Sequence, residues 1–249
     1  MGRYEVLKMD SLDKWLDLLE RWKGAEPDIH YRPEYCGLYI NSGEPRLFIY
    51  REGSNAVIYP FMLRRVNSIS GLAGKLEPDL YDITSPYGYG GPLATGGAGD
   101  STWENFYLSF EEYCASKNIV TEFVRYHPLL ENHRRAYTYM EVVKASSVVY
   151  VDLRQTDQEI WSGYLRNNRN NIKKARREGL EVILEEDPSH FEEFLSVYHH
   201  TMERNAASPS YYFGREYYGM IHNNLKGHYL YAHTLKNGEV ISTELLLYN

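Results

Sequence analysis

The chain has 249 residues, a formal net charge of −7 and ordinary apolar and charged fractions, so it can bury a sizeable core as one large or two small domains. Its two cysteines, Cys36 and Cys114, lie far apart, which argues against a disulfide framework and favours a reducing compartment. We find no apolar signal-peptide core and no apolar run of about 20 residues. We therefore expect a cytoplasmic protein without a transmembrane segment.

The first half of the chain, residues 1–146, predicts a mixed α/β domain. An amphipathic helix begins after Asp10-Ser11, and a short helix begins after Pro33. The apolar runs Arg46–Arg51 and Ala56–Arg64 predict a hairpin, in which Pro60 suggests an edge strand or a bulge. The remaining predicted elements are a glycine-rich stretch at Tyr81–Gly97, a helix at Thr102–Ser116, a strand at Ile119–Arg125 and a short helix at His127–Ala136.

The second half, residues 147–249, begins with an apolar strand, SSVVYVDL. A helix then starts at Thr156, which forms a capping-box pattern with Glu159, and runs to about Glu178 before Gly179. The later elements are a strand at Leu180–Glu185, helices at Pro188–Arg204 and Phe213–Leu225, and a hairpin of His228–Leu235 and Glu239–Tyr248 around Asn237-Gly238. Because the chain stops at an apolar strand with nothing to cover it, we expect a fragment, or a chain completed by a partner.

The predicted helix of residues 164–179 carries a local excess of positive charge. From Arg166 to Arg177 it has six basic residues and no acidic one, which suggests a surface for an anion on an acidic protein. Its candidate ligand-binding residues are Arg166, Asn168, Arg169 and Lys173. They would suit a nucleotide sugar, a lipid-linked diphosphate sugar or an RNA acceptor stem, whereas the plain alternative is a solvated amphipathic helix.

A second candidate segment is the loop of Ser85–Pro92. Its glycines permit positive φ and close backbone approach to a ligand, and its tyrosines offer ring faces and hydroxyl groups. Its candidate substrate-binding residues are Tyr87, Gly88, Tyr89, Gly90 and Gly91. The loop has neither a dinucleotide nor a Walker fingerprint, and a Gly/Pro-rich connector is the alternative interpretation.

Three segments together resemble a known family. RNNRNNIKKARREG is similar to the helix motif of Fem-type, peptidoglycan-bridge-forming aminoacyltransferases and their acetyltransferase-like relatives, which belong to the bacterial-type GNAT superfamily. YDITSPYGYGGP and YHHTMERNAASPSYYF resemble two further segments of the same relatives. The resemblance covers roughly Tyr81 to Asn249. It implies two tandem GNAT-like domains, a degenerate one at residues 1–146 and one at residues 147–249 that is incomplete at its C-terminus.

The resemblance also implies a function: transfer of an acyl or aminoacyl group to an amine of a sugar- or cell-envelope-linked substrate. The acyl donor would be acetyl-CoA or aminoacyl-tRNA as co-substrate, with no bound cofactor. In a GNAT domain the donor's pyrophosphate lies on the loop and helix after the fourth strand, and the chain ends at about that point of its second domain. The second domain therefore has no obvious donor site.

Direct transfer requires a base for the amine proton. Glu244 is the first candidate, since its carboxylate would have a raised pKa if buried among apolar neighbours, and Asp82, just before the glycine loop, is the second. No cysteine or histidine cluster has zinc spacing and no nucleophile elbow is present, so we expect no metal site and no covalent intermediate. An edge-strand charge is the alternative interpretation of Glu244.

Two other functions remain open at this stage. A non-catalytic binding module for a phosphate-bearing ligand is one, and an RNA-binding protein that uses the basic helix is the other, although the net negative charge counts against RNA. The sequence alone does not choose the donor, the acceptor or the oligomeric state.

Overall fold

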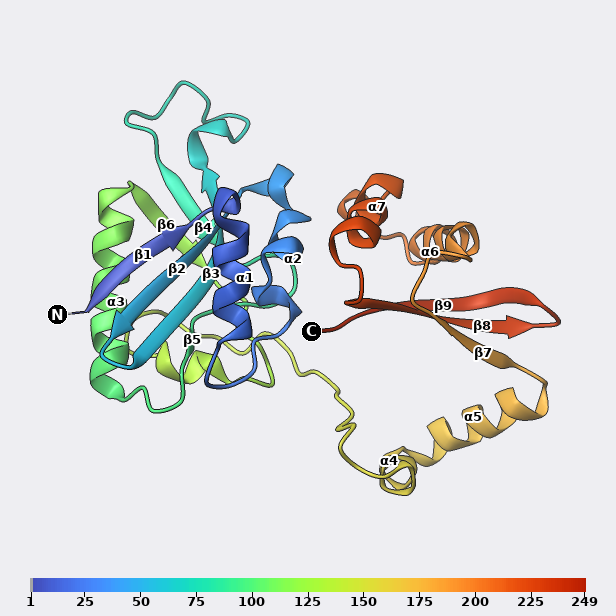
Figure 1. Ribbon diagram of the computed structural model, residues 1–249. Helices are drawn as coiled ribbons and strands as arrows, with labels where there is room; N and C mark the ends of the chain where they lie inside the picture. Colours follow the sequence, from blue (N-terminus) through green and yellow to red (C-terminus); the bar gives the residue numbers. More distant parts are fainter. Residues whose placement is uncertain (1) are drawn as a thin grey trace. The chain divides into compact units, whose positions relative to one another are not determined.

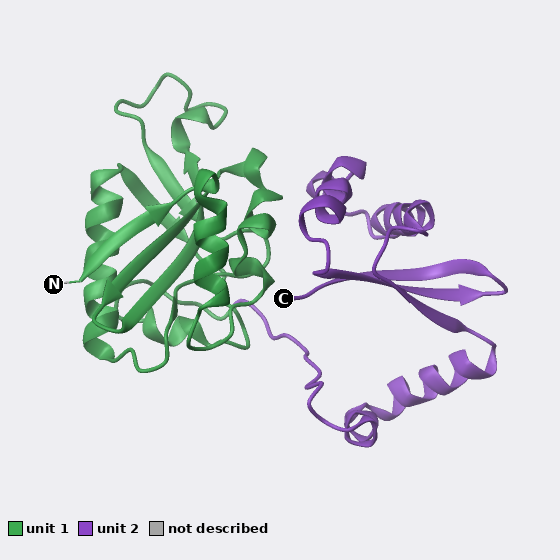
Figure 2. Cartoon of the chain, in the orientation of Figure 1, with its two compact units in different colours: residues 1–144, 249 green, residues 145–248 purple. Residues whose placement is uncertain are grey.

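The computed structural model describes residues 2–249, which divide into two compact units (Figure 2). Unit 1 comprises residues 2–144 with Asn249, and unit 2 comprises residues 145–248. Both contain helices and a β-sheet, so the predicted mixed α/β class is confirmed. No helix within residues 2–249 is long and apolar enough to cross a membrane.

Unit 1 is a mixed sheet with helices on both faces (Figure 1). Its strands run in the order β1-β2-β3-β4-β6, with β5 beside β3; β4 and β6 are parallel and the other pairs antiparallel. The strands are β1 (Arg3–Leu7), β2 (Glu44–Glu52), β3 (Asn55–Arg65), β4 (Tyr81–Thr84), β5 (Leu93–Ala94) and β6 (Ile119–Phe123). The helices are α1 (Leu12–Glu20), α2 (Pro33–Gly37) and α3 (Asp100–Ser116).

The core of unit 1 follows the two-residue period of β2 and β3. Phe48 and Tyr50 point to an aromatic layer under α3, whereas Leu47 and Ile49 point to the opposite layer, which contains Trp15. Each fully buried side chain of this size contributes roughly 1.5–3 kcal/mol. Because both faces are covered, the middle parts of β2 and β3, Leu47–Tyr50 and Ala56–Leu63, are continuous apolar runs rather than alternating apolar and polar residues.

The predicted hairpin of β2 and β3 is confirmed, but the edge position suggested by Pro60 is wrong. β3 is central: residues 57 and 58 pair with β5, and residues 62–65 pair with β4. Pro60 falls between these two stretches, where β3 changes its neighbour on that side. A residue without an N–H group is tolerated there because no ladder bond to β4 or β5 is lost.

Unit 2 is a three-stranded antiparallel sheet, β7-β8-β9, with α6 and α7 on one face (Figure 1). The strands are β7 (Glu181–Glu185), β8 (Tyr229–Lys236) and β9 (Glu239–Leu247). The helices are α4 (Asp157–Gly163), α5 (Arg166–Arg177), α6 (Phe191–Arg204) and α7 (Arg215–Asn224). The turn at Asn237-Gly238 has positive φ at both residues, as the sequence predicts for this hairpin.

Short 3-10 turns complete the chain at Met9–Ser11, Ile29–Tyr31, Ile40–Ser42, Val66–Ser68, Asn132–Arg135 and Pro209–Tyr211. The predicted short helix at His127–Ala136 is reduced to one of these turns.

Two predictions for unit 2 are wrong. The apolar segment before Leu153 forms no strand, and Val149 is 97% exposed, because β propensity without a hydrogen-bonding neighbour makes no ladder. The single helix predicted from Thr156 is divided into α4 and α5 by extended backbone at Tyr164 and Leu165. The capping box of Thr156 and the positive φ of Gly179 are both present.

Candidate functional site

The glycine loop follows β4 in unit 1, and two of its glycines have a conformation that favours glycine. Gly88 has φ +97° and Gly91 has φ +95°. A Cβ atom on Gly88 would lie 2.7 Å from Cδ2 of His30 and closer still to its Nε2 atom. A Cβ atom on Gly91 would lie 2.8 Å from Nδ2 of Asn132. At these two positions the loop backbone packs directly against the side chains of His30 and Asn132, and any residue larger than glycine would overlap them.

Side-chain donors from elsewhere in unit 1 hold the carbonyl groups of this loop. The hydrogen bonds run from Tyr35 Oη to Tyr87 O (2.6 Å), from Tyr31 Oη to Gly91 O (2.9 Å) and from Asn132 Nδ2 to Gly90 O (2.9 Å). Tyr31 and Asn132 are buried. Hydrogen bonds in such surroundings are strengthened by the low dielectric, so the loop has a fixed shape.

Beside the loop, Asp28 brings two histidines together. Its Oδ1 atom accepts from the backbone N–H of His30 (3.0 Å) and contacts Nδ1 of the same residue, while its Oδ2 atom lies 3.0 Å from Nε2 of His127. Asp28 also caps the 3-10 turn of Ile29–Tyr31, which places it next to His30 along the chain. His127 lies in the segment that follows β6 and is only 6% exposed.

The hydrogen bonds of His127 define its tautomer. Its Nδ1 atom accepts from the backbone N–H groups of Leu129 and Leu130, both at 3.2 Å. That atom therefore carries no proton, and Nε2–H donates to Asp28. His127 thus acts as a neutral donor that fixes the carboxylate.

His30 has the opposite arrangement. Its Nδ1–H donates to Asp28, so the unprotonated atom of the neutral ring is Nε2, which faces the backbone of Gly88. The ring of Tyr89 packs edge-on against both imidazoles, with centroid distances of 5.5 Å to His30 and 5.4 Å to His127. An imidazole oriented by a carboxylate in this way is the arrangement of a general base.

The pKa of Asp28 reflects these contacts. Burial alone would raise it, but the hydrogen bonds from His127 and His30 outweigh burial and hold the pKa of this carboxyl well below its usual range. The group is therefore a fixed negative charge at neutral pH. Such a charge stabilises an imidazolium that forms when His30 accepts a proton.

Asp28, His30 and His127 also have the donor atoms of a metal site. The contacts of His127 favour proton handling instead. Nδ1 of this ring already accepts two backbone N–H groups, and its Nε2–H donates to Asp28. Neither nitrogen of His127 therefore has a lone pair available to a metal ion.

The two carboxylates predicted as bases do not have the required surroundings. Asp82 is buried, but both of its oxygen atoms accept from Arg64, at 2.8 and 2.6 Å, so it is one half of a bidentate ion pair. Glu244 is exposed on β9 and lies opposite Ala232. The burial on which a raised pKa depended is not present, and Glu244 lies on an edge strand, as its alternative interpretation expected.

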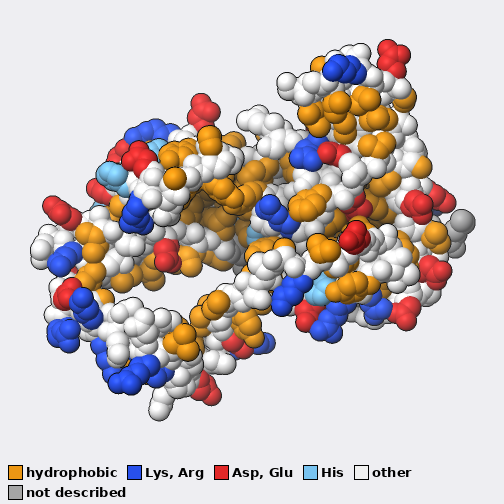
Figure 3. Space-filling view, turned by 180° about the vertical axis from the view of Figure 1, so that it is seen from behind, with side chains coloured by type: hydrophobic (Ala, Val, Ile, Leu, Met, Phe, Trp, Pro, Cys, Tyr) orange, Lys and Arg blue, Asp and Glu red, His pale blue; other side chains and the backbone are white. Residues whose placement is uncertain are grey.

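The basic helix, α5, belongs to unit 2, and its charged side chains are largely exposed (Figure 3). Arg166, Asn168 and Lys173 are exposed. Arg169 is different: its Nη1 atom donates to the carbonyl groups of Trp161 (3.5 Å), Ser162 (3.0 Å) and Tyr164. It therefore closes the break between α4 and α5 through one nitrogen atom, which the backbone carbonyl groups occupy.

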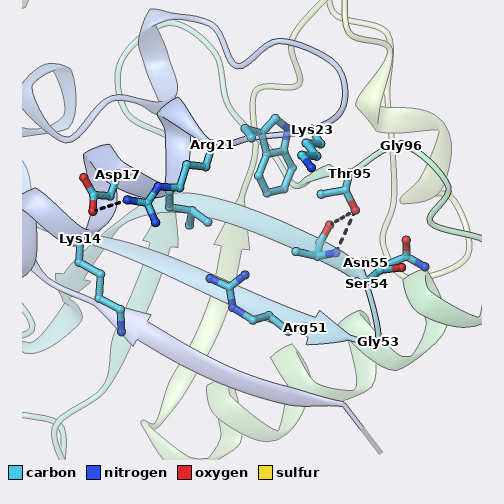
Figure 4. A pocket seen from close by; sticks show the side chains of 13 residues that line it. Lys14, Asp17, Arg21, Lys23, Arg51, Gly53, Ser54, Asn55, Thr95 and Gly96 are labelled. Carbon is cyan, nitrogen blue, oxygen red and sulfur yellow. Dashed lines mark hydrogen bonds and ion pairs between the residues drawn. The ribbon is translucent and has the colours of Figure 1, made fainter.

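A polar hollow lies elsewhere in unit 1, between α1 and the β2–β3 hairpin (Figure 4). Its lining includes the cations Lys14, Arg21, Lys23 and Arg51. Three of these are partly neutralised: Lys14 and Arg51 both pair with Glu5, and Arg21 lies 3.5 Å from Asp17. None of the glycine-loop or Asp28-cluster residues lines this hollow, so it is separate from the candidate site.

Searches of protein-family models and of curated proteins return no match for this chain. The candidate site therefore stands on its geometry. Sequence reasoning identified the loop of Tyr87–Gly91 but missed Asp28, His30 and His127. The spacing Asp28-Ile29-His30 was a weak local signal, whereas His127 is 99 residues from Asp28 and only the fold joins them.

Proposed function

We propose that the protein is an acyltransferase of the GNAT type, similar to Fem-type enzymes, that acts on an amine of a sugar- or cell-envelope-linked substrate. The observation that carries the proposal is the Asp28–His30 pair against the glycine loop. It supplies a base with a fixed partner, which Glu244 and Asp82 do not. The basic face of α5, with Arg166 and Lys173 exposed, suits a phosphate group on the acceptor or donor.

The topology of unit 1 supports the same proposal. Strands β1 to β4 are antiparallel, and β6 joins β4 in parallel. The glycine loop and then α3 come after the fourth strand, which is where a GNAT-type domain would hold the donor's pyrophosphate. We propose that unit 2 is a second, GNAT-like copy and that the protein works in the cytoplasm.

The proposed chemistry balances as a direct transfer. The acceptor's ammonium group first releases one proton to water. The neutral amine nitrogen then forms a bond to the donor carbonyl carbon, while Nε2 of His30 accepts the second proton that this nitrogen loses and Asp28 stabilises the imidazolium that results. The bond from the carbonyl carbon to sulfur or oxygen breaks. The proton held by His30 passes to the leaving thiolate or alkoxide, which regenerates the neutral ring.

A transfer assay tests this proposal. The chain is incubated with acetyl-CoA or with aminoacyl-tRNA, together with a UDP-linked peptidoglycan precursor that bears a free lysine amine, and the product is followed by mass spectrometry. Replacing His30 by glutamine should lower the rate by roughly 10²–10⁴-fold. The matched control is His200→Gln, on the exposed side of α6, which should leave the rate within about twofold.

A second function, a binding module without catalysis, is favoured by the engagement of Asp82 with Arg64 and by the exposure of Glu244. It predicts saturable binding of the UDP-linked precursor and no product with either donor. A strong fall of tRNA affinity with salt and no precursor binding would instead favour an RNA-binding protein. Equal rates for the wild type and His30→Gln would overturn the assignment of the base.

A further inference from the structure

Unit 2 holds a second cluster of histidine and carboxylate side chains, which the proposed transfer does not use. Glu185 is the last residue of β7, His190 immediately precedes α6, and His233 lies on β8, opposite Ile183. One ligand atom from each lies within 4.8 Å of the others. The three residues come from three elements of the same unit, so the fold and not the local spacing brings them together.

His233 is the residue that needs an explanation. It is 1% exposed, and its Nε2 atom has no hydrogen-bond partner among residues 2–249. The nearest carboxylate atom, Oε2 of Glu185, is 3.5 Å away, which is longer than a normal hydrogen bond. A buried polar atom left in this state is destabilising, and such atoms are rare in folded proteins.

The other nitrogen of His233 is well placed. Nδ1 lies 2.9 Å from the hydroxyl group of Thr243, its neighbour across the β8–β9 ladder. If Nδ1–H donates to this hydroxyl oxygen, the lone pair of Nε2 points at Glu185 and is available to a ligand. The ring is also fixed by stacking on Tyr231, with centroids 5.5 Å apart and an interplanar angle of 10°.

We propose that Glu185, His190 and His233 bind a divalent transition-metal ion of the zinc class. Two imidazole nitrogens and one carboxylate oxygen are a ligand set that zinc accepts, with further positions for water or substrate. Nδ1 of His190 is 2.6 Å from Oε1 of Glu185. Tetrahedral ligands at metal bonds of about 2 Å lie about 3.3 Å apart, so small side-chain rotations bring the three atoms to that separation.

The surroundings match those of a metal site. The hydroxyl group of Thr243 acts as the outer partner that orients a ligating histidine. Glu185 and His190 retain 15% and 34% side-chain exposure, which gives an ion a path from solvent. The buried partner, His233, is held by the sheet, so the site needs little ordering when the ion binds.

The test uses the full chain, freed of metal with a chelator and carrying no histidine tag. Co²⁺ is titrated and its visible absorption followed, and Zn²⁺ affinity is then measured by competition with a chromophoric chelator. We expect one ion per chain and a rise in the thermal unfolding midpoint with Zn²⁺. His233→Ala and Glu185→Gln should each weaken Zn²⁺ binding by at least 100-fold, and Thr243→Val by roughly 10-fold.

The exposed His200→Ala variant is the matched control, since it removes one imidazole from α6 without touching the cluster. It should bind Zn²⁺ like the wild type. Glu185→Gln keeps the size of the side chain and serves if His233→Ala does not fold. Failure of the wild type to bind Co²⁺ or Zn²⁺, or equal Zn²⁺ affinity in the wild type and Glu185→Gln, would overturn the proposal.

Discussion

Replacing Gly88 by alanine tests how closely the glycine loop packs on His30. Two costs are expected. An alanine at φ +97° is strained by roughly 1–2 kcal/mol. Its Cβ atom would also overlap the imidazole, at 2.7 Å from Cδ2, and overpacking of this kind costs about 1–3 kcal/mol. The expected loss of stability is therefore roughly 2–5 kcal/mol.

Gly97→Ala is the matched control for backbone strain. Gly97 has φ +93°, but the nearest atom to its Cβ position is Oδ1 of Asn55, at 3.7 Å. This variant should lose only the first cost, roughly 1–2 kcal/mol. The difference between the two variants isolates the contact with His30.

Urea unfolding followed by tryptophan fluorescence measures both losses. Trp161 is the one tryptophan of unit 2, so a Trp161→Phe background makes the signal report on unit 1. Gly88→Ala should also slow acyl transfer by about 10²-fold, because the base is displaced. Losses for Gly88→Ala and Gly97→Ala that agree within about 0.5 kcal/mol would refute the close packing of the loop on His30.

Three further changes give distinct results. Asp28→Asn should cost roughly 1.5–3 kcal/mol at neutral pH, through the loss of hydrogen bonds to a charged carboxylate. Because the folded pKa of Asp28 lies below the unfolded value of 3.8, this difference from the wild type should shrink as pH falls below 3.8 in urea titrations. Burial raises the pKa of Glu122 above 4.5, and the hydrogen bond from the Tyr59 hydroxyl offsets part of this rise. The wild type should therefore lose stability relative to Glu122→Gln as pH rises above 4.5, and a pH-independent difference would contradict this. Arg169→Gln should speed amide hydrogen exchange in α4 and α5 through the loss of about 1.5–3 kcal/mol of charged hydrogen bonding. Arg166→Gln, at an exposed position of α5, should not, and equal exchange in the two variants would count against the bridging role of Arg169.

The features that sequence predicted well depend on nearby residues. The β8–β9 turn at Asn237-Gly238 and the capping box of Thr156 and Glu159 are local, and both are present. The strand predicted before Leu153 failed because a strand requires a neighbour. The prediction of one continuous helix across Tyr164 failed for a related reason. Arg169 stabilises the break through hydrogen bonds to backbone carbonyl groups, and a periodic sequence pattern does not record such contacts.

The candidate site shows the same division. The glycines of the loop were visible because their residue type is itself the signal. The base was not, since Glu244 was judged by its apolar neighbours along the strand and proved exposed. Asp28 and His30 are close in the sequence, but His127 lies 99 residues from Asp28 and reaches it only in the folded chain, so the sequence concealed the cluster.

The central claim is that Asp28 holds His30 with an unprotonated Nε2 atom toward Gly88. Long-range ¹⁵N–¹H correlation spectra of histidine-labelled protein at neutral pH report the tautomer of each ring, and His30→Gln and His127→Gln assign the signals. We predict a proton on Nδ1 of His30 and on Nε2 of His127. A proton on Nε2 of His30, with Nδ1 bare, would contradict the assignment of His30 as the base.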